Sequence, residues 1–549
     1  MRGRAQGQVK QRARSEAPVS DSGPSVVIGA GPTAAAAAKA LLGAGQRVLV
    51  VDTGLSLEPE REAARQRMAA TTPENWQPAD VSLTRFTAAG ASARGYKRLF
   101  GSDVAFRDDG VLELSVDPGV GARPSYALGG LSNVWGSGLL QYTDRDLDGW
   151  PIVASELADG YRAVLDYVPY AGEEDEFAER YPLVRVPDGP LIRTEAGQAV
   201  LSRLRRHRPA LAAAGYHFGA SRLAVRVGHP APANGCVYCG HCLDGCPYGH
   251  IYSAAQTIEE LRREGLIEYR SGLHVDRVSE QDEGVLVEAT ALAGGPPVTI
   301  RSPRAFLAAG VISTTIILQR SGLLPERAEI ADSQALYLPF AWIGRTGETG
   351  REPGHTLAQT SIVLDDPAVC ANPIHITLYT YNDGLTERAR EAHPRLSGLL
   401  GPALDTVTRR LAVGICFFHS DDSDHIATSL VDGGESVRLE PVLNPAARAT
   451  FRRFQHALLR SLGPIGLLPL APLAEIAPPG GGYHYGASIP MSTRPGFGQC
   501  DTLGRPSATR RIHVVDASCF PSVPGGAITF SGMANSHRIA TAVAREDPR

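Results

Sequence analysis

Four of the eight cysteines in this 549-residue chain lie close together and form a candidate metal site. Cys236, Cys239, Cys242 and Cys246 have the spacing C-x2-C-x2-C-x3-C, and a proline follows the last of them. Soft thiolate ligands favour iron–sulfur clusters or zinc over hard ions. Thiolates at this spacing on a glycine-containing loop can wrap one face of a cuboidal iron–sulfur cluster. The run therefore predicts a metal centre, with iron and sulfide as the first expectation.

The same spacing leaves several kinds of site open. It is found in the cluster loops of bacterial ferredoxins, where the fourth cysteine of a run serves a second cluster. Since this chain has one such run, either Cys246 folds back to complete a 4Fe–4S cluster or three thiolates hold a 3Fe–4S cluster. Four cysteines could also bind zinc, although structural zinc sites usually place two pairs further apart. The run could instead hold no metal or form disulfides. His241 and His250 are nearby, and neither is predicted to be a ligand.

A glycine motif near the N-terminus predicts a dinucleotide site. Gly29 allows a tight turn after an apolar strand, and Gly31 lets the backbone approach a pyrophosphate. Ala34 lets the following helix pack closely on the strand, and the N-terminus of that helix offers free N–H groups to phosphates. Asp52 ends the next strand, about twenty residues on, and can accept hydrogen bonds from the adenosine ribose.

The elements that must position these residues come from both ends of the chain. Apolar runs predict strands over 25–28 and 47–51, with an alanine-rich helix between them that ends near Leu42. Near the C-terminus, residues 511–515 read as another strand, and residues 529–544 as a helix. A dinucleotide domain that is completed by the far C-terminus is common among flavoproteins and unusual among simple NAD dehydrogenases.

Four segments in order give this chain a resemblance to the glucose–methanol–choline (GMC) flavoprotein oxidoreductases. They are the glycine motif, residues 306–312 (FLAAGVI), residues 484–491 (HYGASIPM) and residues 515–521 (VDASCFP). The resemblance implies bound FAD and oxidation of an alcohol by hydride transfer to the flavin. It implies an α/β fold: a Rossmann-type FAD-binding domain with an inserted α+β substrate domain that carries a mixed or antiparallel sheet. It also places Asp516 at the cofactor and gives Val275 a backbone contact to the adenine.

The loop from Tyr126 to Trp135 narrows the resemblance. It is similar to the flavin-contacting loop of pyranose oxidases and related FAD sugar dehydrogenases, which would place Gly130, Ser132, Asn133 and Val134 at the cofactor. Some of those enzymes have a histidine before the tryptophan that bonds covalently to the flavin. Val134 stands there in this chain, so the FAD is expected to be noncovalent.

The catalytic pair of the family is only half present. His484 matches the catalytic histidine, and a neutral imidazole suits removal of a hydroxyl proton near pH 7. The family's second residue, a His or Asn, lies eleven positions after the Asp of the C-terminal motif, and counting from Asp516 reaches Ala527. Arg538 still falls where the family has arginine, so the count has no gap. The expected substitutes are Tyr483, Tyr485, Ser488 or a group from the middle of the chain.

These features predict an FAD-dependent alcohol dehydrogenase. Its substrate would carry a secondary hydroxyl on a sugar or a sugar-like, glycosylated biosynthetic molecule. Some bacterial sugar dehydrogenases of the GMC type hold a cluster in a similar cysteine-rich segment, whereas the long-chain alcohol oxidases have cysteine-rich stretches that need not bind one. A cluster beside the flavin would pass electrons to an external acceptor. Two alternatives stay open: redox-neutral flavin chemistry such as elimination or isomerisation, favoured by Ala527, and an electron-carrier subunit.

The composition argues against several other classes of protein. The 54 basic and 58 acidic residues give a net charge of −4, which argues against nucleic-acid binding through phosphate contacts. No apolar run is long enough for a membrane segment, and residues 1–23 read as a disordered basic tail without a signal-peptide core. A cytoplasmic protein is therefore expected. The predicted FAD-binding domain comprises 24–145, 230–325 and 478–549, with the cysteine loop at 236–247, and the predicted substrate domain comprises 146–229 and 326–477.

Overall fold

A five-stranded parallel sheet joins the two ends of the chain. The computed structural model describes residues 23–85, 98–228, 233–347, 354–381, 398, 401 and 403–546, so the expected basic tail lies almost wholly outside the described residues. The strand order is β20-β9-β1-β2-β5, and every neighbouring pair is parallel. These strands are β1 (Ser25–Ile28), β2 (Val48–Val51), β5 (Glu268–Arg270), β9 (Ala305–Leu307) and β20 (Ile512–Val514).

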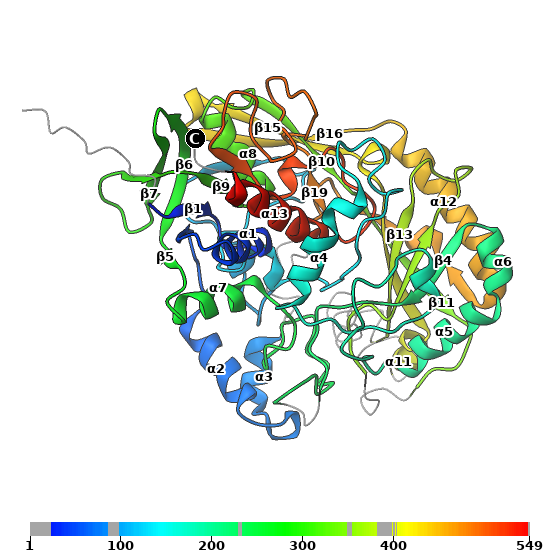
Figure 1. The fold of residues 1–549 in the computed structure, drawn as a ribbon. Coiled ribbons are helices and arrows are strands. Elements are labelled where there is room, and N and C mark those ends of the chain that lie inside the picture. Colours follow the sequence, from blue (N-terminus) through cyan, green and yellow to red (C-terminus); the bar gives the residue numbers. More distant parts are fainter. Residues whose placement is uncertain are drawn as a thin grey trace, which may run out of the picture.

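Helices from opposite ends of the chain pack together beside this sheet. α1 (Pro32–Gly43) and α13 (Ile528–Arg545) lie side by side, as the blue and red ribbons of Figure 1 show, and α4 (Ala158–Leu165) packs on α13. Gly160 makes the second contact close, because a Cβ there would lie 2.3 Å from the carbonyl oxygen of Ala534. α7 (Ala254–Arg263) and α8 (Val311–Arg320) complete the layer around the sheet. A three-stranded antiparallel sheet adjoins it, made of β6 (Leu273–Gln281), β7 (Gly284–Ala291) and β8 (Val298–Ser302).

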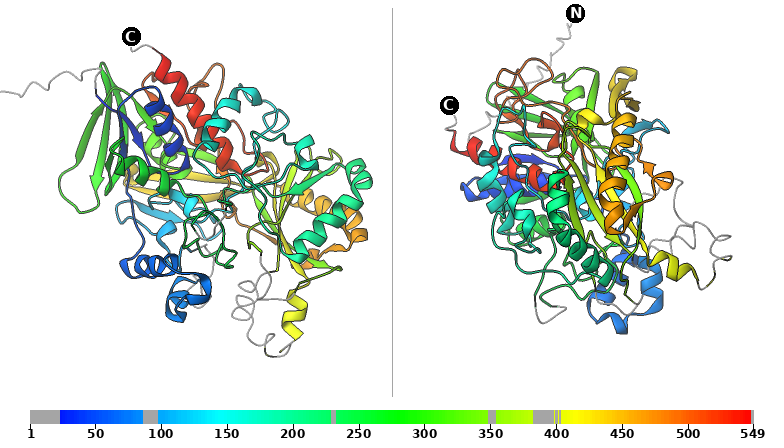
Figure 2. Two further views of the ribbon diagram at one scale, coloured as in Figure 1. Left: turned by 60° about the horizontal axis from the view of Figure 1, so that its bottom comes forward. Right: turned by 90° about the vertical axis from the view of Figure 1, so that its right-hand side faces the viewer.

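A seven-stranded antiparallel sheet forms the other lobe (Figure 2). Its path is β17-β11-β14-β13-β12-β4, with β18 also paired to β11. Helices α5 (Glu195–Arg206) and α12 (Ala447–Leu462) bury apolar residues against one face. The strands are β4 (Tyr216–Ala220), β11 (Ala335–Trp342), β12 (Thr360–Leu364), β13 (Ile374–Thr380), β14 (Leu411–Phe417), β17 (Leu467–Pro469) and β18 (Glu475–Ile476).

A mixed five-stranded sheet has the order β19-β10-β15-β16-β3. Only the β16–β3 pair in it is parallel. Its strands are β3 (Glu113–Val116), β10 (Arg327–Asp332), β15 (His425–Val431), β16 (Ser436–Val442) and β19 (Tyr485–Gly486). The remaining helices are α2 (Pro59–Ala69), α3 (Pro78–Thr84), α6 (Arg208–Ala213) and α11 (Ala403–Thr408).

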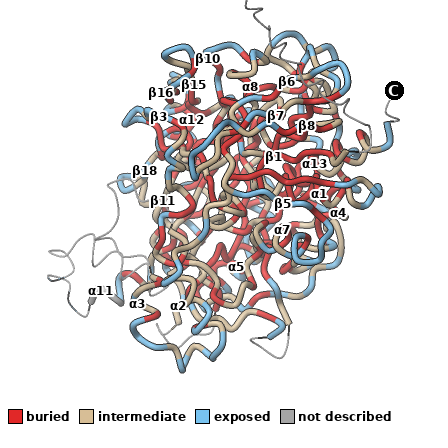
Figure 3. Tube along the Cα trace, turned by 90° about the vertical axis from the view of Figure 1, so that its left-hand side faces the viewer, coloured by how far each residue is buried: buried red, intermediate tan, exposed pale blue. Residues whose placement is uncertain are grey.

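The expected fold class is confirmed. A Rossmann-type parallel sheet built from both chain ends carries an inserted part with mixed and antiparallel sheets. The buried segments gather along the parallel sheet and its helices and along the strands of the second lobe (Figure 3). The exact domain boundaries stay a prediction. In the described part of the chain, no helix combines the length and the apolar character needed to cross a bilayer.

Candidate active site

One cavity extends from the glycine turn after β1 to the face of the seven-stranded sheet. Its lining comes from both lobes of the molecule. Three groups of residues matter here, namely the turn and Asp52, the loop around Gly130, and the segment around His484 with the sheet behind it. The topology therefore brings the predicted dinucleotide motif and the predicted catalytic histidine into one space.

The glycine turn leaves room beside the backbone. Gly29 has φ +102°, and a Cβ there would lie 2.4 Å from the carbonyl oxygen of Ala308 on the neighbouring strand. Gly31 begins α1, and a Cβ there would meet no atom within 4 Å. Ala34 is fully buried within α1. The first N–H groups of a helix point at this empty space, which suits a phosphate.

Asp52 lies at the end of β2, at the cavity wall. Burial raises the pKa of its carboxyl group to about 7, and its neighbours Thr53 and Tyr269 only partly oppose this effect. A smaller cavity adjoins it and shares Gly29 and Asp52 as lining. Val275, the predicted adenine contact, lines that smaller cavity. Asp52 therefore lies where the main cavity and the smaller cavity adjoin.

The loop predicted to touch the flavin has two kinds of residue. Gly130 and Val134 line the main cavity, and a Cβ at Gly130 would lie 3.6 Å from Cα of Gly31. Ser132 also lines it, but its hydroxyl accepts a hydrogen bond from the N–H of Ala254 at the start of α7. Asn133 is not among the lining residues, and its amide bonds two carbonyls of its own loop. Asn133 thus shapes the loop.

Asp516 joins the C-terminal motif to the first residues of α8. One carboxylate oxygen accepts hydrogen bonds from the N–H of Gly310 (3.0 Å) and the hydroxyl of Thr314 (2.5 Å). The other accepts from the N–H of Ser518 at 3.0 Å. Asp516 lines the main cavity, so it fixes the wall at that point and leaves little of its carboxylate for a ligand.

His484 lines the cavity opposite the glycine turn. Its imidazole stacks on Phe417, the last residue of β14, with ring centroids 4.2 Å apart and planes 24° apart. Its carbonyl accepts from the N–H of Ser333 at 2.7 Å, and β19 begins at the next residue. The Nδ1 atom is buried, and the imidazole as a whole lines the cavity.

Ala527 lines the same cavity, at the N-terminus of α13. The residues expected to replace the missing second catalytic group lie in different places. Tyr483 and Tyr485 line the cavity, but the Tyr485 hydroxyl donates to the carbonyl of Arg123 at 3.2 Å and the Tyr483 ring stacks on Phe106. Ser488 is outside the lining, where its hydroxyl accepts from Thr315 at 2.6 Å.

One face of the seven-stranded sheet supplies residues that the sequence analysis did not single out. On β13 the apolar residues Ile374, Ile376 and Leu378 belong to the second core. The alternate residues of β13 line the cavity, together with residues of β11 and β12: His375, Thr377, Tyr379, Tyr337 and Ser361. Because side chains alternate along a strand, the polar–apolar alternation in this stretch is the signal that could have identified them.

The four clustered cysteines surround a second, apolar cavity. All eight cysteines of the chain are free thiols, so the disulfide alternative is wrong. Cys236, Cys239, Cys242 and Cys246 all line this cavity, and burial, reinforced by the nearby thiols, raises the pKa of Cys236 to about 12. The Sγ atoms of Cys236 and Cys246 accept backbone N–H groups at 3.4 and 3.3 Å.

No metal site is shown by this arrangement. Among the described residues, no group of three or more His, Cys, Asp or Glu converges well enough to hold an ion. The four thiols instead stand around a space. A single tetrahedral zinc ion needs convergent sulfurs, whereas the ligands of a multi-iron cluster stand apart around it.

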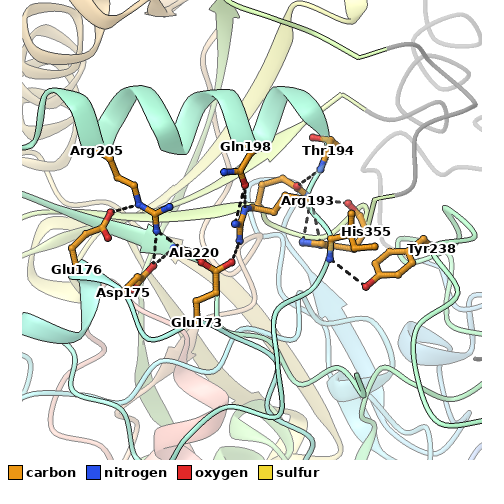
Figure 4. Close-up of polar contacts among 12 residues, drawn as sticks. Glu173, Asp175, Glu176, Arg193, Thr194, Gln198, Arg205, Ala220, Tyr238 and His355 are labelled. Carbon is orange, nitrogen blue, oxygen red and sulfur yellow. Dashed lines mark hydrogen bonds and ion pairs between the residues drawn. The ribbon is translucent and has the colours of Figure 1, made fainter. Parts of the chain in front are cut away.

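The cysteine cavity is fixed between neighbouring elements. On one side, the guanidinium of Arg65 in α2 donates to the carbonyl of Pro247 at 3.0 Å. On the other, Tyr238 and His355 bond the main chain of Ile192 just before α5, next to the Arg193–Glu173 ion pair (Figure 4).

The two cavities share walls. Leu357 lines the cysteine cavity and Ala358, the next residue, lines the main cavity. Leu223 lines the main cavity and Val225 the cysteine cavity. Two extended residues span roughly 7 Å. In these two segments, residues one or two positions apart thus line different cavities.

Comparison with known proteins bears on the fold. No protein-family model matches the chain, and none of the curated proteins is similar to it in sequence. Its structure is similar to the crystal structure of pyridoxine 4-oxidase from Mesorbium loti, with a TM-score of 0.55 and 14% sequence identity over 94% of this chain and 98% of that one. The chain thus has, over nearly its whole length, the fold of an enzyme that bears the name of an oxidase.

Proposed function

We propose that this protein is an FAD-dependent alcohol dehydrogenase of the GMC type that acts on a hydroxyl-rich substrate. One observation carries the proposal: the glycine turn, Asp52 and His484 line the same cavity. A dinucleotide held by the first two would extend toward the third. The likeness to pyridoxine 4-oxidase, at the level of the fold, supports the same assignment.

FAD fits the residues present. The empty space beside Gly31 would take the pyrophosphate, Asp52 would accept the ribose hydroxyls, and the recess at Val275 would take the adenine. The flavin would extend past Gly130 and Val134 toward His484. Valine has no group that could bond to the flavin, so the cofactor would be noncovalent at that position.

Bound FAD would supply the hydride acceptor of the reaction. The alcohol carbon loses its hydrogen as hydride, and the hydroxyl loses its proton to Nε2 of His484, so that a carbonyl product forms. The stacking of His484 on Phe417 fixes the plane of the imidazole. An imidazole held in one plane on the cavity wall would suit proton transfer from a bound alcohol.

The polar face of the second lobe supports a sugar or sugar-like substrate. Tyr337, Thr377 and Tyr379 place hydroxyl-bearing side chains on the cavity wall, and the first two lie between apolar neighbours that belong to the core. Hydroxyl groups can both donate and accept hydrogen bonds. They suit a substrate that presents several hydroxyls, as a secondary alcohol on a sugar ring does.

We further propose that the four thiols hold an iron–sulfur cluster of the 4Fe–4S or 3Fe–4S type. They ring one apolar cavity, and two of their sulfurs accept backbone N–H groups, which is a common feature of cluster loops. The shared walls of the two cavities support a path from the flavin to the cluster and on to an external acceptor.

The flavin part of the proposal is tested by anaerobic bleaching. Purified protein should contain FAD, and sugars, glycosides or pyridoxine from a fixed panel should bleach its visible absorbance without oxygen. A His484→Ala protein should keep its FAD and lose about 10²- to 10⁴-fold in the rate of bleaching. Wild-type rates in that variant would remove His484 from the chemistry. Turnover without any net bleaching would favour redox-neutral chemistry instead.

The metal part needs a separate measurement. Protein prepared without oxygen should contain iron and acid-labile sulfide, with a broad absorbance that persists after the flavin is removed. Less than about one iron atom per chain in fresh protein would contradict the cluster, since either cluster type needs at least three. Rapid consumption of oxygen by substrate-reduced protein would favour an oxidase over a dehydrogenase.

A further inference from the structure

His375 is a buried histidine that faces the main cavity. It lies on β13 and is 5% exposed. Within the described part of the chain, neither of its ring nitrogens has a hydrogen-bond partner. A buried polar group without a partner costs free energy, and it is retained where a ligand supplies the partner. The position of His375 on the cavity wall offers such a ligand.

The sheet places His375 next to the catalytic histidine. His375 pairs with Phe417 across β13 and β14, so both side chains point to the same face of the sheet. Phe417 in turn stacks on His484. Phe417 thus connects the two histidines, as the cross-strand neighbour of one and the stacking partner of the other, and all three line the cavity.

A bridge to the C-terminal segment also brings the strand of His375 near Ala527, where the family has its second catalytic residue. Ile374 forms a parallel bridge with Gly525. His375 is the residue after Ile374, and Ala527 is two residues after Gly525. Ala527 and His375 both line the main cavity, so β13 places a polar side chain in the same cavity as this alanine.

We propose that His375 is a catalytic residue that donates a hydrogen bond to the substrate oxygen while His484 accepts the hydroxyl proton. This inference rests on the proposed function and names the group that replaces the missing partner at position 527. It takes that group from the inserted sheet and not from the C-terminal segment.

The electrostatics of the site suit this task. Burial lowers the pKa of His375 to about 4, so the imidazole is neutral at pH 7 and carries one N–H. A neutral N–H stabilises developing negative charge on oxygen without competing for the proton that His484 takes. Two of the three substitutes expected from sequence are engaged elsewhere, because Tyr485 donates to Arg123 and Ser488 accepts from Thr315 outside the cavity.

The test compares three variants at position 375 with a matched control. His375→Phe keeps an aromatic ring and His375→Leu is smaller, so both remove the N–H at different cost to packing. His375→Asn restores a donor. The control is His217→Leu, because His217 pairs with Val363 in the same row of the sheet, two strands from His375, and does not line the cavity.

The first readout is the affinity of the bound flavin for sulfite, which adds to oxidised flavin and bleaches it. The sulfite oxygens then occupy the region of the substrate oxygen. His375→Phe and His375→Leu should weaken sulfite binding about tenfold or more, since a hydrogen bond to an anion is lost. His375→Asn should recover most of that affinity, and His217→Leu should match wild type.

The second readout is the rate of flavin bleaching by the best panel substrate. The Phe and Leu variants should lose about 10²- to 10³-fold in this rate, with a smaller change in KM. Wild-type sulfite affinity and wild-type rates in a folded, FAD-containing Phe or Leu variant would overturn the assignment. Equal losses in the Asn and Leu variants, with equally lowered melting temperatures, would also overturn it and assign His375 to packing. Wild-type protein that holds no FAD would refute the proposed function itself.

Discussion

At the residue scale, the proposed role of Asp52 predicts that FAD binding depends on pH. Burial raises its pKa to about 7 in the protein without FAD, whereas ribose hydroxyls donate to the carboxylate form. Binding therefore favours the ionised group and releases a proton. FAD affinity should rise about tenfold from pH 6 to pH 8. Titration of the apoprotein with FAD at both pH values measures this, and Asp52→Asn should bind weakly with no such dependence. An unchanged pH dependence in that variant would assign the effect to another group.

His513 makes the stability of the fold depend on pH, through a pKa that is lowered and not raised. It is fully buried on β20, stacks on Phe306, and has its pKa lowered to about 4 by burial. Since the unfolded histidine binds a proton near pH 6.5, the unfolded state binds more protons between these values. Stability is therefore present at pH 7 and is lost as the pH falls.

The corresponding variant is His513→Asn, which keeps a donor for the carbonyl of Leu503. The loss of free energy of unfolding between pH 7 and pH 5 should be smaller than in wild type by about 2 kcal/mol. Urea denaturation at the two pH values gives both losses. Because each protein is compared with itself at the two pH values, the cost of the cavity left by the smaller side chain cancels. Identical losses of free energy in the two proteins would contradict the prediction.

Some site residues were predictable from sequence and others were not. Gly29, Gly31 and Asp52 belong to a local pattern whose spacing follows from backbone geometry. His375 has no local motif, because its role depends on a strand pairing with Phe417 and on a bridge to Gly525, far along the chain. Asn133 is the opposite case. It lies in a loop that the sequence identified, but its amide donates to carbonyls of that loop and does not line the cavity.

At the element scale, the two faces of β13 should respond differently to substitution. Ile376 is fully buried in the core of the seven-stranded sheet, and Thr377 faces the cavity. Ile376→Ala should lower the free energy of unfolding by about 2–5 kcal/mol and leave substrate affinity nearly unchanged. Thr377→Val should leave the free energy of unfolding nearly unchanged and raise KM a few-fold for a hydroxyl-rich substrate. Denaturation and steady-state kinetics on the same two proteins separate these effects. A rise in KM in both variants would show that the two faces are coupled.

The elements themselves were predicted to within a residue or two. The helix expected over 529–544 extends from Ile528 to Arg545, and the strand expected over 47–51 is Val48–Val51. Strong apolar periodicity and the alanine-rich composition decide these bounds. Sequence patterns do not show which strands become neighbours, so the register that unites β13, β14 and the C-terminal loop had no local signal.

At the scale of the whole molecule, the fold interleaves the chain so that two cavities meet. The parallel sheet takes its strands from residues 25–51, 268–270, 305–307 and 512–514, and the main cavity has lining from both this domain and the inserted lobe. The cysteine loop follows β4, and the bridge between Val225 and Ile251, which both line the cysteine cavity, joins its two ends. Both cavities are therefore assembled only in the complete fold.

This arrangement predicts that oxidation of substrate and exit of electrons can be separated. Cys246→Ser replaces one thiol of the cysteine cavity, whose Sγ accepts the backbone N–H of His250 at 3.3 Å. The variant should lose iron and keep both its FAD and the wild-type rate of anaerobic bleaching. Reoxidation of its flavin by ferricyanide should slow on the order of tenfold, because the one-electron exit is lost. The matched control is Cys370→Ser, since Cys370 lies outside the cavity and donates to Asp422 as a serine hydroxyl could. Equal reoxidation rates in wild type and Cys246→Ser would mean that electrons leave the flavin directly, and that the cysteine cavity serves the fold alone.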